Sequence, residues 1–175
     1  SALHQRQGAR NSIQVAANGL PPLIFAAAGY FSGNQLFFLA CLAAFAVATA
    51  DTFSSEIGML SRRKPVSILT GKPVPKGISG GITPLGLAAA ALGSLFLALP
   101  ALFAFGTAGA LVVWLCGIIG SLLDSLMGAL LQAKYRLPSG GLTEQPHIEG
   151  RLLPLVGGVA WINNDMINFL SILLC

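Results

Sequence analysis

The chain has 175 residues, of which 54% are hydrophobic and only 9% are charged. In an ordinary soluble domain roughly a quarter of the residues are charged, and the ten basic and six acidic side chains here are too few to cover a folded protein in water. The composition therefore excludes a soluble globular domain, a disordered chain and a protein that binds nucleic acid.

Five stretches are apolar over a length that can cross a bilayer, for which about 20 residues are needed. In chain order, we expect spanning helices over residues 11–31, 35–60, 83–103, 107–133 and 154–175. The short alternating segments of a membrane β-barrel do not appear, and a helix bundle is then the remaining way to satisfy the backbone in lipid. The sequence predicts an all-α fold, a polytopic transmembrane helix bundle that forms one membrane domain over residues 1–175.

The lysines and arginines lie in three segments: before the first predicted helix, between the second and third, and between the fourth and fifth. The other two connections carry no charge. With five spans the three basic segments share one side of the membrane, which the positive-inside rule identifies as cytoplasmic. We expect a protein of a bacterial inner membrane or a plastid membrane, with the basic loops 61–82 and 134–153 facing the cytoplasm or stroma.

Four of the six acidic residues fall inside predicted spans, where acidic side chains are costly and indicate a functional site. They are Asp51, Glu56, Asp124 and Asp165. We expect Asp51, Asp124 and Asp165, like Asn18, at a similar depth in the membrane, about 15 Å from the basic side at 1.5 Å per residue. Carboxylate and amide oxygens without nearby His or Cys are ligands suited to Mg²⁺. The alternative is that these groups only form hydrogen bonds between helices.

The loop from Gly71 to Pro84 is rich in glycine and carries two lysines, and it leads directly into the third predicted helix. Thr83 is a favourable N-cap and Pro84 suits the first helical position. Backbone amides at a helix N-terminus favour phosphate, although an ordinary solvated loop is the alternative. Beside hard-metal ligands, such a loop predicts a phosphoryl-transfer site. The acceptor would be a lipid whose tail lies between helices.

Three segments, 50–58, 71–81 and 161–168, together with the shorter stretches 11–19 and 120–125, resemble the phytyl-phosphate kinase family of integral membrane proteins. More distantly, the chain is similar to CTP-dependent dolichol kinases and phosphatidate cytidylyltransferases. The resemblance implies transfer of the γ-phosphate of a nucleoside triphosphate, typically CTP, to an isoprenyl monophosphate such as phytyl phosphate. The product would be an isoprenyl diphosphate for tocopherol or quinone biosynthesis. Members usually carry further membrane helices upstream, which we expect to be missing from this chain.

This resemblance and the residue chemistry together give each candidate residue an expected role. The expected catalytic residues are Asp51, Glu56, Asp124 and Lys76. The expected Mg²⁺ ligands are Asp51, Asp124 and Asp165. The expected nucleotide-binding residues are Lys72, Lys76, Gly77, Gly80, Gly81 and Thr83. The expected ligands of the lipid phosphate are Asn18, Asn164, Asp165 and Asn168.

Rival functions remain open at this point. Acids near the middle of the membrane also bind coupling ions in secondary transporters. A purely structural membrane subunit would use the same polar groups to hold its helices together. A CTP-dependent prenol kinase or a cytidylyltransferase would share the metal and the nucleotide but differ in acceptor or product. The oligomeric state is also open, a homo-oligomer included.

Overall fold

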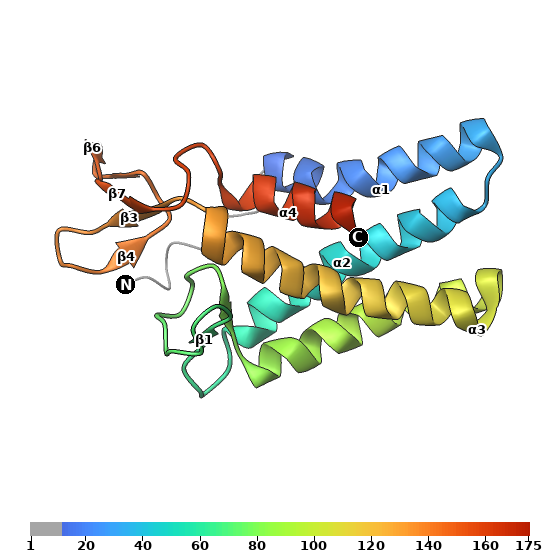
Figure 1. The fold of residues 1–175 in the computed structure, drawn as a ribbon, viewed down its shortest axis with the longest axis horizontal. Coiled ribbons are helices and arrows are strands. Elements are labelled where there is room, and N and C mark those ends of the chain that lie inside the picture. The colour runs from blue at the N-terminus through green and yellow to red at the C-terminus, as the bar shows by residue number, and fades with distance from the viewer. Residues whose placement is uncertain (1–11) are drawn as a thin grey trace.

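The computed structural model describes residues 12–175, so that Asn11 and the basic residues before it lie outside the described residues. Most of the described chain is helical, and the helices run along the long axis of the molecule (Figure 1). Their bounds are α1 Ser12–Ser32, α2 Leu36–Gly58, α3 Pro84–Leu131 and α4 Asn164–Leu174. α4 lies beside α1 and the second part of α3, whereas α2 packs most extensively on α3.

The two basic loops lie at one end of the helices, and short strands form within and beside them (Figure 1). An antiparallel pair joins β1 (Val66–Ser67) to β2 (Gly81–Ile82). The second loop contains a three-stranded sheet in the order β4-β3-β7 and the pair β5-β6. The bounds of these strands are β3 Lys134–Arg136, β4 Leu142–Thr143, β5 His147–Ile148, β6 Arg151–Leu152 and β7 Leu155–Gly157. The all-α prediction is therefore correct for the helices but wrong for these loops.

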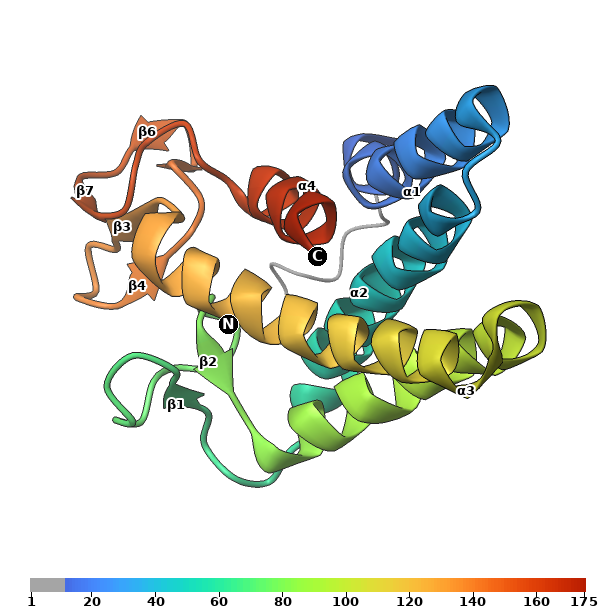
Figure 2. The ribbon, with the colours of Figure 1, turned by 45° about the vertical axis from the view of Figure 1, so that its right-hand side comes forward.

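α3 consists of two helical legs that meet at Gly106, whose φ of 69° and ψ of −172° are essentially restricted to glycine. The chain reverses there, so the two legs lie side by side (Figure 2). They correspond to the predicted helices 83–103 and 107–133. The first leg begins as its sequence predicts, with the Thr83 hydroxyl accepting a hydrogen bond from the Gly86 N–H at 3.0 Å.

The predicted helix over 154–175 is wrong in its first part, because β7 occupies residues there and α4 begins only at Asn164. The side chain of Asn163 caps this helix by accepting a hydrogen bond from the Met166 N–H at 3.0 Å. Asp165 consequently lies in the first turn of α4 rather than deep within a helix. In this chain α4 extends over 11 residues.

Two of the described helices, α2 and α3, are long and apolar enough to cross a membrane. The 48 residues of α3 are divided into two legs at Gly106, and α1 contains Pro21 and Pro22. The prediction of about five spanning helices is thus not confirmed in that number. The basic loops nevertheless lie at the same end of the helices, as the charge pattern predicts (Figure 1).

Glycines in the second leg of α3 allow this leg to approach α2 and the first leg closely. A β-carbon at Gly117 would overlap Ser94, and one at Gly120 would overlap Val47. Packing of small residues is the main source of helix association in lipid. Asp124, one turn beyond Gly120, is buried on the same side of the helix.

The break in α3 can be tested with two substitutions that each add a methyl group in open space. At both Gly106 and Gly19 a β-carbon meets no atom within 4 Å. We expect Gly106→Ala to lower the free energy of unfolding by about 1–3 kcal/mol, because alanine is strained in that conformation. Gly19→Ala, within helix α1, is expected to raise it by up to about 1 kcal/mol. Thermal unfolding in detergent measures both, and equal effects would contradict a glycine-dependent reversal.

Candidate active site

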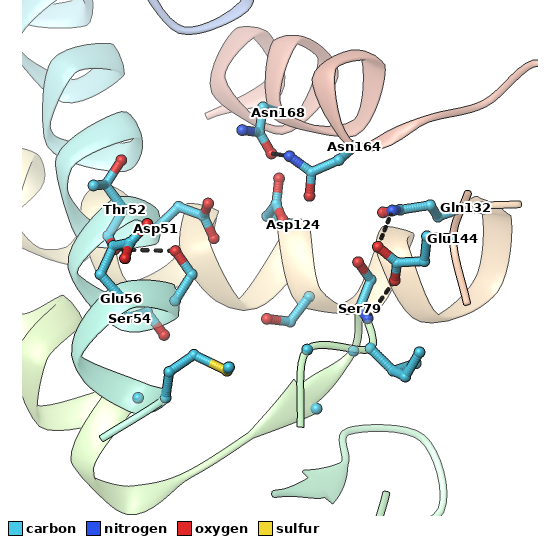
Figure 3. Close-up of a pocket in the computed structure, with 18 of the residues that line it drawn as sticks. Asp51, Thr52, Ser54, Glu56, Ser79, Asp124, Gln132, Glu144, Asn164 and Asn168 are labelled. Carbon is cyan, nitrogen blue, oxygen red and sulfur yellow. Dashed lines mark hydrogen bonds between the residues drawn. The ribbon is translucent and has the colours of Figure 1, made fainter. Parts of the chain in front are cut away.

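A polar cavity of about 540 Å³ lies among the helices at the end that carries the basic loops (Figure 3). It is lined by residues of α1, α2, α3 and α4 and by both basic loops. Five of its lining residues are acidic: Asp51, Glu56, Asp124, Glu144 and Asp165. Within the described part of the chain, no lysine, arginine or histidine is among the lining residues. The cavity therefore favours cations, or anions that carry a cation with them.

α2 contributes its last two turns, from which Asp51, Thr52 and Glu56 line the cavity (Figure 3). Asp51 is half-buried, whereas Glu56 is exposed. The Ser55 hydroxyl donates to the Thr52 carbonyl at 3.0 Å. Asp51 from α2 and Asp124 from α3 thus approach the same space from different helices.

Asp124 is the most buried acid of the cavity, with 9% of its surface exposed, and α4 supplies polar partners for it. The Ser171 hydroxyl donates to Asp124 Oδ2 at 3.0 Å. The Asn168 amide is oriented so that its NH₂ donates to the same oxygen, also at 3.0 Å. The other end of the Asn168 amide lies 3.2 Å from the side-chain amide of Asn18. One polar network therefore connects α1, α3 and α4.

The glycine-rich loop lies against the second leg of α3 through Gly80. This residue has a φ of +85°, and a β-carbon there would overlap Ala129 and approach the Ser125 carbonyl to 3.1 Å. The neighbouring Ser79 N–H donates to the Glu144 carboxylate at 2.6 Å. Figure 3 shows Glu144 reaching this loop from the second basic loop. One of the backbone N–H groups that were predicted to bind phosphate therefore already donates to a carboxylate.

Gln132 connects the same carboxylate to the end of α3. Its Nε2 donates to Glu144 Oε2 at 2.7 Å, and the residue is only 2% exposed. Its Oε1 is the one buried side-chain polar atom of the described chain that has no hydrogen-bond partner. An unpaired buried acceptor is costly, and the residue that carries it lines the cavity.

The lysines that were predicted to bind the nucleotide do not line the cavity. Lys76 Nζ donates to the carbonyls of Met59 and Ser61, at 3.0 and 2.6 Å, and so neutralises the C-terminal end of α2. Lys134 donates similarly to the last turn of α3. Burial lowers the pKa of Lys134, and the Glu144 carboxylate raises it in part. Lys72 is exposed and, like Lys76, is not among the lining residues.

The structure brings most of the predicted site residues together. The cavity is lined by Asn18, Asp51, Glu56, Gly77, Gly80, Gly81, Thr83, Asp124, Asn164, Asp165 and Asn168. Their roles in binding and catalysis stay predictions. Within residues 12–175 no three His, Cys, Asp or Glu side chains form a group that could hold one metal ion. The predicted Mg²⁺ ligands Asp51, Asp124 and Asp165 thus surround a cavity rather than a single point.

Two lining residues that contact the glycine-rich loop or its partner escaped the sequence analysis, namely Glu144 and Gln132. Gln132 continues the stripe of Asp124 and Gly128 at intervals of one helical turn, and this spacing could have identified it. Glu144 follows no such periodicity. Its only signal was its place in a loop on the same side as the predicted phosphate site.

A profile of the family described as "Integral membrane protein DUF92" matches residues 1–175. The "Uncharacterized membrane protein MJ0933" of Methanocaldococcus jannaschii is 38% identical over 154 residues, 86% of this chain and 60% of the relative. Protein PGR of Arabidopsis thaliana is 38% identical over 146 residues, 74% of this chain and 49% of the relative. "Protein VTE6, chloroplastic" of the same plant is 30% identical over 141 residues, 79% of this chain and 36% of the relative.

The chain thus spans between 36% and 60% of the length of these relatives. No solved structure matches it.

The contact of the glycine-rich loop with α3 can be tested at two glycines that both have positive φ. Gly80 has a φ of +85° and contacts Ala129, whereas Gly77 has a φ of +88° with no atom within 4 Å of a β-carbon. Alanine at either position costs about 1–2 kcal/mol of backbone strain. We expect Gly80→Ala to lower the free energy of unfolding by a further 1–3 kcal/mol or so, because the loop must move off α3. Equal unfolding midpoints in detergent for the two variants would contradict this contact.

Proposed function

The chain belongs to the DUF92 family of integral membrane proteins, and from this membership and the polar cavity we propose that it is a membrane kinase. Its substrates would be a nucleoside triphosphate, typically CTP, and an isoprenyl monophosphate such as phytyl phosphate. The observation that carries the proposal is the acidic cavity, in which carboxylates of α2, α3 and α4 face the glycine-rich loop at the basic end of the helices. A membrane location of the acceptor agrees with the family.

The charge of the cavity supports a metal-assisted reaction. The five carboxylates would repel a bare triphosphate, so an anionic substrate needs a divalent cation in this space. Asp51 and Asp124 provide carboxylate oxygens from two helices, and Mg²⁺ in phosphoryl-transfer sites is commonly held by one or two carboxylates together with substrate phosphates. Two such ligands fit better than the predicted three. When bound, Mg²⁺ would neutralise charge that develops on the transferred phosphoryl group.

The loop and helix α3 supply the groups that would orient the triphosphate. Thr83, the N-cap of α3, lines the cavity, so that the positive end of this helix would favour a phosphate nearby. The Ser79 N–H, now bonded to Glu144, would be available to a phosphate oxygen if that carboxylate moves aside. The buried Gln132 oxygen would accept a hydrogen bond from a bound substrate. Lys72 and Lys76 stay proposed nucleotide-binding residues that would need to leave their present positions.

Across the cavity from the glycine-rich loop, the side-chain amides of α1 and α4 could bind the phosphate of the isoprenyl acceptor. Asn18 and Asn164 lie where α1 meets α4, and they can donate hydrogen bonds to a phosphate monoester. Asn168 would take part only if its NH₂ left Asp124. A phosphate monoester has a second pKa of about 6 and is ionised near neutral pH, so it needs no strong general base. One of its oxygens would form the new bond to the γ-phosphorus. The bond from that phosphorus to the β,γ-bridging oxygen would break, releasing the nucleoside diphosphate.

The proposal is tested by incubating the purified full-length protein with labelled CTP, Mg²⁺ and phytyl, geranylgeranyl or farnesyl monophosphate. We expect CDP and the labelled isoprenyl diphosphate in equal amounts. Release of pyrophosphate would instead identify a cytidylyltransferase. Absence of any nucleotide-dependent product with all three acceptors would contradict the kinase.

Asp51→Asn is expected to lower kcat by about a hundredfold or more, because the variant keeps the shape of the side chain but loses its charge. The matched control is Glu149→Gln, which also removes one carboxylate but lies exposed in the second basic loop, away from the cavity. Unfolding midpoints of both variants separate lost activity from lost stability. An Asp51→Asn protein with near-normal turnover would remove this carboxylate from the proposed mechanism.

The same cavity also favours a second candidate function, an ion-coupled transporter, because its five carboxylates could bind a coupling cation. The two functions differ in their need for nucleotide. A transporter would show counterflow of its solute in proteoliposomes that contain no nucleotide, and Asp51→Asn would abolish this counterflow. A protein that only transfers phosphate would show none.

A further inference from the structure

A second cavity, of about 350 Å³, lies between α1 and α2 and adjoins the polar cavity. We call it the α1–α2 groove. Three of its lining residues, Gln14, Asn18 and Thr52, also line the polar cavity. Its other lining residues are Val15, Gly19, Phe45, Ala48, Thr49 and Phe53. The two spaces therefore form one path that changes from carboxylates and amides at one end to mainly apolar side chains at the other.

We propose that the α1–α2 groove binds the phosphate-proximal part of the hydrocarbon chain of an isoprenyl phosphate, whose phosphate lies in the polar cavity. This inference rests on the proposed function and names the place of its lipid substrate. Along α2 the groove extends from Phe53 to Phe45, which corresponds to about 12 Å at 1.5 Å per residue. An amphiphile with one hydrocarbon chain and one anionic end matches this change from polar to apolar lining residues.

The exposure of the groove residues supports an apolar occupant. Val15 is 61% exposed, Phe45 44% and Phe53 40%, although all three lie on helices that pack against each other. A hydrocarbon chain in the groove would pack against these side chains, and in lipid its affinity would come from this close packing and from the phosphate contacts rather than from removal of apolar surface from water. Gly19 and Ala48 leave space between the larger side chains, which suits the methyl branches of an isoprenoid. Gln14 and Asn18 stand at the junction, where the phosphate would begin.

Gly19 provides a way to fill the groove without disturbing the protein. It lies within α1, lines the groove, and a β-carbon there meets no atom within 4 Å. A tryptophan at this position would occupy the space proposed for the lipid chain. Ala16 is the matched control, because it is exposed on the same helix and lines neither cavity.

The first experiment measures binding without nucleotide and is therefore independent of phosphate transfer. The full-length protein in lipid nanodiscs is labelled with a diazirine-bearing geranylgeranyl monophosphate, and the labelled peptides are mapped by mass spectrometry. We expect label between Phe45 and Phe53, and competition by unlabelled geranylgeranyl monophosphate but not by phosphatidic acid. Gly19→Trp should lower this labelling about tenfold or more, because the indole ring would occupy the space of a few methylene groups of the lipid chain. Ala16→Trp should leave it unchanged.

The second experiment measures transfer to the lipid. Gly19→Trp should raise KM for geranylgeranyl monophosphate about tenfold, whereas Ala16→Trp should leave this KM unchanged. Transfer activity with label that maps outside the groove would overturn this inference and leave the proposed function standing. Label in the groove without any transfer would support the lipid site and contradict the kinase. Equal competition by phosphatidic acid would assign the groove to a bilayer phospholipid and overturn the isoprenyl assignment.

Discussion

The close contact between α2 and the second leg of α3 is the constraint on which the site depends. At Gly117 and Gly120 any β-carbon would overlap residues of the neighbouring helices. Apolar side chains gain little by associating in lipid, so this close packing must hold the two helices together. The same face of α3 carries Asp124, which therefore faces the cavity that Asp51 lines from α2. Bulk added at these glycines would separate the carboxylates before it altered any group that could touch a substrate.

The glycine-rich loop extends this constraint to the end of the molecule. Gly80 rests on α3 near Ala129, and Glu144 bridges the Ser79 N–H to the Gln132 amide. Both basic loops are thus joined to one helix, and the acid that joins them also lines the cavity. A ligand that takes the Ser79 N–H must displace Glu144, which would loosen the connection between the loops. Binding and loop movement are therefore linked through a single carboxylate.

The sequence predicted those parts of the structure that depend on local signals. The charge pattern indicated the end at which both basic loops lie, and Thr83 with Pro84 predicted the start of α3. Counting helical turns predicted that Asp51 and Asp124 lie at the same level of the helices, and both line one cavity; their depth in a membrane stays a prediction. The start of α4 was missed because strands of two or three residues have no readable periodicity, whereas the apolar content of 154–175 is typical of a helix. Glu144 was missed because its contact is made only in the folded chain.

The described lining of the cavity has five carboxylates and no basic side chain, which agrees with the proposal that two anionic substrates meet there together with a divalent cation. Lys76 and Lys134 donate to carbonyls at the ends of α2 and α3, where they stabilise the helices. Carboxylates are costly near the membrane, and a bound cation would lower this cost. A triphosphate that brought its own divalent cation would then fit better than either ion alone. Under the proposed function, the acidic lining would favour a metal–nucleotide complex, and the uncharged amides of Asn18 on α1 and Asn164 on α4 would receive the second phosphate.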